Sequence, residues 1–416
     1  MSNQVAIAIG LVLGLGYGIV ASVSGSPELQ RFAEIISPIG TAFVNLVRMV
    51  VIPLVATTVF VGVSSLSDPR RLSRLGIVTL AFFWITSFLA IGIGMLVMKL
   101  ALFLAPVTVV AAPADEAARE LPTAIEFIVG LIPSNPFAAA AEGALLPLIL
   151  FTVLFGAAVG TLPDSQKEIL VAPANAITTA LIKLILWILW IAPIGVFALA
   201  ASLATAGGLS ILRGVIAFVL SVAVGLAILV GVVILPAVRI LGKTSVRTFL
   251  RAAASPFAIG ASATSSPAAL PALFDSARTQ LHISPPVSSL VLSVGVSINR
   301  PGSALFQGAA IVFLAALYGV SLSGGQIGAA VIATFLVSLT VAGVPSASVV
   351  TITPALQTVG IPLAGLAVLF GIDRIPDMLR SGVNVMAHLA AATVVDRLHG
   401  GALVLDDEGH QLADRR

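Results

Sequence analysis

The stretch "SINRPGSALFQG" (residues 297–308) decides the fold, because it places a charge and a helix break inside a long apolar run. Arg300 is the only Asp, Glu, Lys or Arg between positions 278 and 373. A proline and a glycine follow it, and proline interrupts a helix because it lacks a backbone donor. A charge at the centre of a bilayer costs at least about 2.5–3.5 kcal/mol. The break is therefore predicted to belong to a functional site.

The composition indicates a polytopic helical membrane protein. Of 416 residues, 58% are hydrophobic and 9% are charged, whereas about a quarter of the residues in a soluble domain are charged. Several apolar runs reach the roughly 20 residues that a spanning helix needs, and the alternation of a membrane β-barrel is absent. The chain has no cysteine, which excludes disulfides and thiolate metal sites. Lysines and arginines are scattered at segment ends, so no nucleic-acid partner is expected.

The first half of the chain predicts a series of membrane spans and one orientation. The "SDPRRLSRL" loop (67–75) is basic and is expected to be cytoplasmic, whereas 111–122 is acidic and is expected to be extracellular. Both termini are then cytoplasmic, in a plasma (inner) membrane protein whose first span is retained rather than cleaved. The expected apolar segments are 4–24, 37–66, 76–105, shorter pieces within 123–162, 166–204 and 210–241.

The second half predicts two re-entrant hairpins, each followed by a helix. Segment 246–279 contains "ASATSSPAALP" (261–271), and segment 326–360 contains "AGVPSASVV" (342–350). Such irregular backbone is tolerated at membrane depth only where protein buries it or it lines a cavity. Helices are expected at 286–320 and 363–397, which makes the two hairpin–helix units an inverted repeat typical of transporters. The alternative is a pair of kinked helices.

Polar residues in the last helix form a single stripe. Their spacings of four, three, four and four place them on one helical face: Asp373, Asp377, Arg380, Asn384 and His388. A polar stripe on an apolar helix is expected to face a cavity or a partner. The alternative is an internal ion-pair ladder, in which Asp377 pairs with Arg380 and Asp373 pairs with Arg300.

The break at Arg300 has a physical interpretation of its own. Unwound carbonyl groups near the membrane midplane are where transporters usually hold cations. A guanidinium carries five donors and keeps its charge. We therefore expect Arg300 to take the place of a bound cation permanently.

Five stretches together resemble the glutamate transporter family, also called dicarboxylate/amino acid:cation symporters. They cover nearly the whole chain: "RMVVIPLV" (48–55), "APIGVFAL" (192–199), "SSPAALPALF" (265–274), "AGVPSAS" (342–348) and "DRIPDMLRSGVNVMAH" (373–388). The resemblance implies an all-α fold of eight transmembrane helices plus two re-entrant hairpins, a homotrimer in lipid and an elevator mechanism. A fixed scaffold would comprise 1–75 and 106–204, and a moving transport domain 76–105 and 205–398, followed by a cytoplasmic tail, 399–416.

The resemblance also implies a substrate site. Arg380 matches the arginine that binds an acidic side-chain carboxylate, and Asp377 matches the aspartate that binds the amino group. Together they favour L-aspartate or L-glutamate as the substrate of a secondary transporter that is not an enzyme and has no cofactor. The remaining matching positions are Asn384 and Ser303, Ser265 and Ser266 in the first hairpin, and Ser346 and Ala347 in the second.

The chain departs from the family where sodium binds. Sodium-coupled members carry Asn-Met-Asp-Gly-Thr where this chain has residues 299–303, and a second sodium-binding aspartate has become His388. Arg300 replaces the methionine, Pro301 replaces the first aspartate and His388 replaces the second. The net charge of these three positions changes from −2 to +1, so added sodium would be repelled. We predict sodium-independent binding and no metal. The residues expected to replace the cation or to couple transport to an ion are Arg300, His388, Asn299, Pro301 and Asp373. The residual sodium-site positions are Thr86, Ser87, Asn299 and Asn384, and Phe83 stands where the family has a tyrosine.

Proton coupling through His388 is the leading expectation, since histidine titrates near neutral pH. Asp373 and Asp377 are alternative proton carriers, and a neutral, hydrogen-bonded core histidine stays open. The alternative functions are a C4-dicarboxylate or neutral amino acid carrier and a sodium-coupled member with unusual ligands. An intramembrane hydrolase using Ser262, Ser265 or Ser266 with His388 is disfavoured, because no Gly-x-Ser-x-Gly motif is present.

Overall fold

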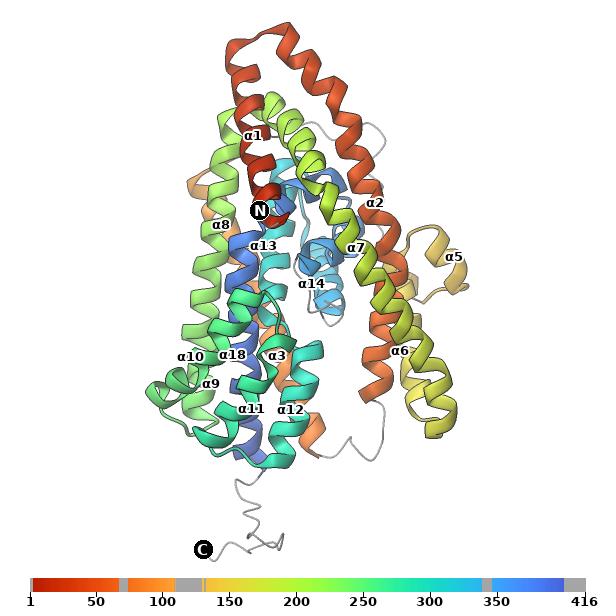
Figure 1. The fold of residues 1–416 in the computed structure, drawn as a ribbon, viewed down its shortest axis with the longest axis vertical. Coiled ribbons are helices and arrows are strands. Elements are labelled where there is room, and N and C mark those ends of the chain that lie inside the picture. Colours follow the sequence, from red (N-terminus) through yellow and green to blue (C-terminus); the bar gives the residue numbers. More distant parts are fainter. Residues whose placement is uncertain are drawn as a thin grey trace, which may run out of the picture.

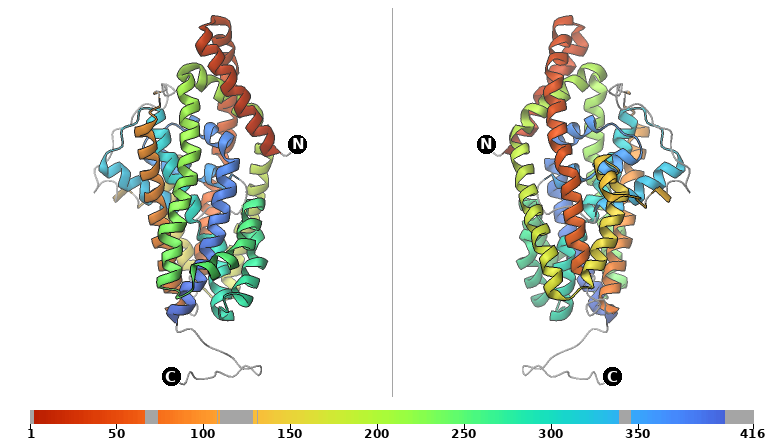
Figure 2. Two further views of the ribbon diagram at one scale, coloured as in Figure 1. Left: turned by 90° about the vertical axis from the view of Figure 1, so that its left-hand side faces the viewer. Right: turned by 90° about the vertical axis from the view of Figure 1, so that its right-hand side faces the viewer.

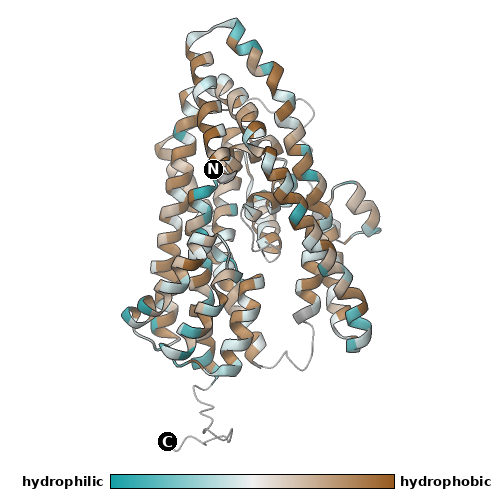
Figure 3. Ribbon diagram, viewed as in Figure 1, coloured by the Kyte–Doolittle hydropathy of each residue, from teal (hydrophilic) through white to brown (hydrophobic). Residues whose placement is uncertain are grey.

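The part of the chain that the structure describes consists of helices and the short connections between them, and contains no strand. The computed structural model describes residues 3–66, 74–107, 109, 129–130, 132–338 and 346–399. Apolar residues dominate the long helices, with polar residues gathered near their ends (Figure 3). Within the described residues, seven helices are long and apolar enough to cross a membrane: Val5–Ser24, Pro27–Ser64, Leu75–Leu104, Asp164–Gly207, Leu209–Ile240, Pro285–Leu317 and Arg374–His399. The predicted all-α membrane fold is confirmed.

One group of helices packs around α7 (Asp164–Gly207). Both α1 (Asn3–Ser24) and α2 (Pro27–Leu66) pack along it, and α6 (Leu145–Gly160) packs against α2 and carries the short α5 (Pro136–Ala141), as Figure 1 shows. The α1–α7 contact is close because three glycines of α1, four residues apart, face α7. A Cβ atom at Gly10, Gly14 or Gly18 would collide with a carbonyl oxygen of α7. Small residues at this spacing let membrane helices approach closely.

A second group surrounds α18 (Arg374–His399) and α13 (Pro301–Leu317). The helix α3 (Arg74–Leu104) packs along α13 and against α8 (Leu209–Ile228), which continues through the π-helix η2 (Leu229–Ile234) into α9 (Leu235–Ile240). The helix α12 (Pro285–Ile298) packs on α18. Both α13 and α18 are buried along most of their length, so the polar stripe lies inside the protein.

The first predicted hairpin is confirmed as two helices joined at the serine-rich turn. Helix α10 (Val246–Ala263) ends at Thr264, which adopts a left-handed conformation with a φ of 49°. The turn is closed by a hydrogen bond from the Ser265 N–H to the Gly260 carbonyl, 3.2 Å. The chain then returns through η3 (Pro267–Ala269) and α11 (Leu270–Thr279), which pack against α10. Small residues and prolines break the helix where the sequence predicts.

The second hairpin consists of α14 (Gly324–Ser338), α15 (Ala347–Thr351) and α16 (Thr353–Thr358). Both α15 and α16 pack against α14, so α14 forms one arm of the hairpin and the two short helices form the other. Figure 2 shows this hairpin on one side of the bundle, where α14 also contacts α3. Its predicted tip includes residues 342–345, which lie outside the described residues.

Several expected boundaries differ from the structure. Helix α2 begins at Pro27 rather than near 37, because Glu28, Arg31 and Glu34 interrupt the apolar pattern without interrupting the helix. The expected helix 363–397 is divided into η4 (Leu363–Gly365), α17 (Leu366–Ile372) and α18, with Asp373 at the last joint. The described part of 123–162 forms α5 and α6. The loops at 67–73 and 111–122 and the tail 400–416 lie outside the described residues.

Candidate functional site

The helix break predicted around Arg300 separates α12 from α13. Asn299 and Arg300 have ψ angles of 95° and 62°, so neither continues the helix. Pro301 then starts α13, where a missing N–H costs nothing because the first turn has no partner for it. The break leaves carbonyl groups of α12 without their helical donors. Their replacement donors decide the chemistry of this region.

Two side chains that depart from the sodium-coupled pattern cap these carbonyl groups. The Arg300 Nη2 donates to the carbonyl of Val296 at 2.8 Å, one turn back along the same helix. The His388 Nε2 lies 2.6 Å from the carbonyl oxygen of Asn299. A carbonyl oxygen only accepts, so the His388 Nε2 carries the hydrogen. Both side chains are buried, at 5% and 0% exposure.

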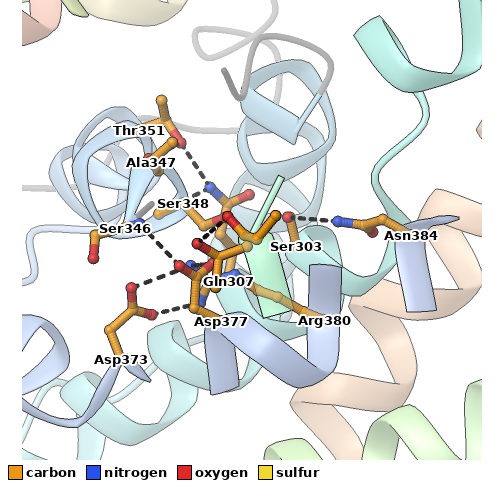
Figure 4. Close-up of polar contacts among 12 residues, drawn as sticks. Ser303, Gln307, Ser346, Ala347, Ser348, Thr351, Asp373, Asp377, Arg380 and Asn384 are labelled. Carbon is orange, nitrogen blue, oxygen red and sulfur yellow. Dashed lines mark hydrogen bonds and ion pairs between the residues drawn. The ribbon is translucent and has the colours of Figure 1, made fainter. Parts of the chain in front are cut away.

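The Arg380 guanidinium is held by two carboxylates of its own helix region (Figure 4). The Asp373 carboxylate accepts two hydrogen bonds from it, Nη1 to Oδ1 at 2.5 Å and Nη2 to Oδ2 at 3.2 Å. The Asp377 Oδ1 lies 2.8 Å from Nη2. The expected Asp377–Arg380 pair is therefore present. The expected Asp373–Arg300 pair is wrong, because Asp373 turns to Arg380, seven residues along and two turns up the same helical face.

An aromatic ring fixes the plane of that guanidinium. The Cζ of Arg380 lies 4.3 Å from the centroid of the Phe306 ring on α13. Phe306 is itself fully buried and packs edge-on against Phe218 of α8, with centroids 5.4 Å apart. Such a cation–π contact covers one face of the guanidinium. Ligands therefore cannot approach Arg380 from the face that Phe306 covers.

Asn384 ties α18 to the start of α13. Its Oδ1 accepts from the Gly302 N–H at 2.8 Å, and its Nδ2 donates to the Ser303 Oγ at 3.2 Å. A Cβ atom on Gly302 would lie 2.7 Å from the Arg380 carbonyl oxygen, so only glycine allows this approach. The predicted pair of Asn384 and Ser303 is thus brought together beside Arg380.

The second hairpin reaches the same cluster through its backbone. The Ser346 N–H donates to the Asp377 Oδ2 at 3.2 Å, and Ser346 adopts a left-handed conformation with a φ of 60°. Ala347 begins α15 and is buried. Gln307 of α13 anchors the hairpin from below, donating to the Ser348 carbonyl and the Thr351 Oγ1, both at 3.1 Å (Figure 4).

Gln307 is a residue that the sequence analysis missed. Gln307 is uncharged and lies in an apolar helix, so the charge pattern that indicates the other site residues does not indicate it. The available signal was that Gln307 is the only amide side chain within Pro301–Leu317. A fully buried amide needs partners, and here its nitrogen finds them on the second hairpin, whereas its oxygen has none among the described residues.

The other predicted residues lie around this centre. Ser265 and Ser266 form the turn of the first hairpin, and the Ser266 Oγ is buried without a hydrogen-bond partner within the described residues. Thr86 and Ser87 are buried on α3, where the Thr86 hydroxyl donates to the Phe82 carbonyl at 2.8 Å. Both polar atoms of the Asn299 amide are likewise buried and unpaired among the described residues. Over that same part of the chain, no group of three or more His, Asp or Glu could hold a metal ion.

Comparison with known proteins identifies the family. Residues 4–398 match the family model described as the sodium:dicarboxylate symporter family. The chain belongs to this family. It is an integral membrane transporter of a symporter family that carries acidic amino acids or C4-dicarboxylates, and not an enzyme. The predicted resemblance is confirmed.

Three relatives show the range of this family. The proton/glutamate-aspartate symporter of Escherichia coli (strain K12) is 32% identical over 403 residues, which cover 94% of this chain and 91% of that protein. The proton/sodium-glutamate symport protein of Bacillus caldotenax is 30% identical over 402 residues, 95% of this chain and 94% of that protein. The C4-dicarboxylate transport protein of Rhizobium etli is 30% identical over 403 residues, 94% of this chain and 87% of that protein.

Proposed function

We propose that this chain is a secondary active symporter that carries L-aspartate or L-glutamate together with protons and without sodium. The observation that carries the proposal is the pair of donors on the broken helix, Arg300 on the Val296 carbonyl and His388 on the Asn299 carbonyl. These donors occupy carbonyl groups that a cation would otherwise need. Sodium would also meet the fixed charge of Arg300 at short range in a buried region, where charges are poorly screened.

The proposed substrate follows from the charges on α18. Arg380 presents a planar fork that suits a carboxylate, and in this proposal it binds the side chain of an acidic amino acid. Asp377 binds the amino group of the substrate, which replaces the Arg380 guanidinium as the cation beside this carboxylate. Asn384 and Ser303 supply neutral polar contacts, and the hairpin residues Ser265, Ser266, Ser346 and Ala347 hold the α-carboxylate.

The rival substrate class is a C4-dicarboxylate, which one relative is named for. A dicarboxylate offers two anionic groups and no amino group. It would bring its second charge towards Asp377, a buried carboxylate, and like charges in a buried site repel. Asp377 therefore favours an amino acid. The same site would be a poor fit for a neutral amino acid, which leaves the Arg380 fork without an anionic ligand.

The proposal extends to how the protein moves and assembles. The α7-centred helices form the scaffold of a homotrimer in the plasma membrane, and the α18-centred helices with both hairpins form a domain that moves across it. Exposed apolar side chains along α7, such as Trp187 and Trp190 at 70% and 77% exposure, suit lipid or a second copy of the chain. Both termini are cytoplasmic, in line with the basic loop at 67–75.

The decisive experiment is aspartate binding to the purified protein by calorimetry in sodium-free buffer and then in saturating sodium. Binding of similar strength in both buffers supports the proposal. Binding that requires sodium would refute the cation-replacement half of it and leave the substrate half standing. Succinate, a C4-dicarboxylate without an amino group, is the matched competitor. Tighter binding of succinate than of aspartate would refute the substrate half.

A further inference from the structure

We propose that Asp373 is the proton carrier of this transporter, and that it acts by leaving the Arg380 guanidinium when the substrate carboxylate arrives. This inference rests on the proposed function, because it assumes an acidic amino acid as substrate. It names the group that takes the proton, which the sequence leaves open among His388, Asp373 and Asp377.

Asp373 already occupies the place where the substrate carboxylate must bind. Its carboxylate engages both terminal nitrogens of Arg380, at 2.5 and 3.2 Å. The same edge is the one that binds a carboxylate through two parallel hydrogen bonds. Phe306 covers one face of the guanidinium, so the fork cannot be approached from that side. An acidic substrate therefore replaces Asp373 in the plane of the fork.

The buried charges of the site balance one another before the substrate binds. Within the described residues, the buried charged side chains are Arg300 and Arg380, with one positive charge each, and Asp373 and Asp377, with one negative charge each. Their sum is zero. Aspartate or glutamate adds two carboxylates and one amino group, a net charge of −1. Neutrality of the loaded site then requires one positive charge, and one proton supplies it.

Of the three candidate proton acceptors, only Asp373 loses its partner when the substrate binds. Asp377 keeps a cation beside it, because the substrate amino group takes over from Arg380. His388 already uses its Nε2 hydrogen on the Asn299 carbonyl, and a second proton would create a like charge beside Arg300 on the same break. Asp373 alone loses its cation. A carboxylate that is 1% exposed cannot stay ionised without a partner, so it takes the proton.

The surroundings of Asp373 offer few other charges. Arg374 follows it at the start of α18 and is half-buried, and Asp377 and Arg380 lie further along the same helix. Among the elements that pack against α17, Arg48 of α2 is half-buried, whereas Lys183 of α7 and Arg213 of α8 are exposed. The described residues of α15 carry no titratable side chain.

The exchange balances in atoms and charge. One proton from solvent adds to an Asp373 carboxylate oxygen as the Arg380–Asp373 hydrogen bonds break and Arg380–substrate hydrogen bonds form. Release of the substrate reverses each event, and the proton leaves on the side where the substrate leaves. Because binding takes up a proton, affinity for the substrate falls as the pH rises, by up to about tenfold per pH unit for one proton.

The test is calorimetry of aspartate binding in buffers of different ionisation enthalpy, which counts the protons taken up. The wild type should take up about one proton per aspartate. Asp373→Asn keeps the shape and a hydrogen-bond acceptor for Arg380, and should bind aspartate with an uptake near zero and an affinity that hardly varies with pH. Asp275→Asn, an exposed carboxylate on α11, is the matched control and should keep the wild-type count.

The outcomes separate this inference from the proposed function. A wild type that binds no acidic amino acid refutes the proposed function. A wild type that binds aspartate without proton uptake, or an Asp373→Asn variant that still takes up one proton, overturns the Asp373 assignment alone. Loss of uptake in His388→Gln with retention in Asp373→Asn would transfer the role to His388. If Asp373→Asn does not fold, infrared difference spectra of the wild type decide: a protonated-carboxyl band on aspartate binding supports the inference, and its absence overturns it.

Discussion

Replacing Arg300 by methionine tests most directly whether its guanidinium takes the place of a bound cation. The substitution restores the residue type of sodium-coupled members at this position and removes one positive charge from a buried site. It also removes the 2.8 Å hydrogen bond from the guanidinium to the Val296 carbonyl. That carbonyl is then a buried acceptor without a donor, which costs roughly 1–3 kcal/mol of stability.

The effect on substrate binding is a separate, electrostatic term. The four buried charges sum to zero with Arg300 present, and to −1 without it. For unit charges roughly 6–10 Å apart at an effective dielectric constant of about 20, Coulomb's law gives about 1.7–2.8 kcal/mol. A substrate with a net charge of −1 should therefore bind about 15- to 100-fold more weakly.

The assay is calorimetry of aspartate binding to Arg300→Met in choline buffer, with Arg300→Lys as a control that keeps the charge but not the fork. Arg300→Lys should lose less affinity than Arg300→Met. Added sodium should recover part of the loss in Arg300→Met, because the freed carbonyl groups accept a cation, and should leave the wild type unchanged. Equal affinity of Arg300→Met and the wild type in sodium-free buffer would refute the reasoning.

Three further substitutions test the site. Gly302→Ala places a methyl group against the Arg380 carbonyl. It should lower the free energy of unfolding by about 1–3 kcal/mol and weaken aspartate binding. A melting temperature equal to that of the wild type would contradict the close packing. Gln307→Ala removes both anchors of the second hairpin, so amide exchange in α15 and α16 should accelerate and aspartate should dissociate faster; unchanged exchange would disprove the anchoring. Asp377→Ala should lose aspartate binding and bind succinate more tightly than the wild type does, because the repelling carboxylate is gone. Normal aspartate affinity would show that the amino group binds elsewhere.

The positions of the backbone breaks were predictable because proline, glycine and small residues act locally. The turn near Thr264 and the break at Asn299 both fall where the sequence places them. The start of α2 was not predictable from hydropathy, because hydropathy marks the part of a helix that suits the membrane and not the part that is helical. Glu28 and Arg31 belong to that helix all the same.

The partners of the buried charges could not be ranked from the sequence. Asp373 and Asp377 are seven and three residues before Arg380, and both spacings place a carboxylate on its face. The choice between Arg380 and Arg300 for Asp373 depends on how α18 lies against the α12–α13 break, which is a tertiary property. The donors to the Val296 and Asn299 carbonyl groups also depend on the tertiary structure. The departures from the family pattern at Arg300 and His388 indicate the region where these donors lie.

A permanently attached cation has a consequence for energy coupling under the proposed function. Arg300 is present in both the empty and the loaded site and never leaves the protein, so it cannot transmit the energy of an ion gradient. Only a species that binds and leaves with the substrate can do so. If sodium is replaced by Arg300 and His388, that species must be another cation. Under the same proposal, the zero sum of the buried charges among the described residues sets its number at one per acidic amino acid. Displacement of Asp373 from Arg380 would then provide a carboxylate for a proton only when the substrate is bound.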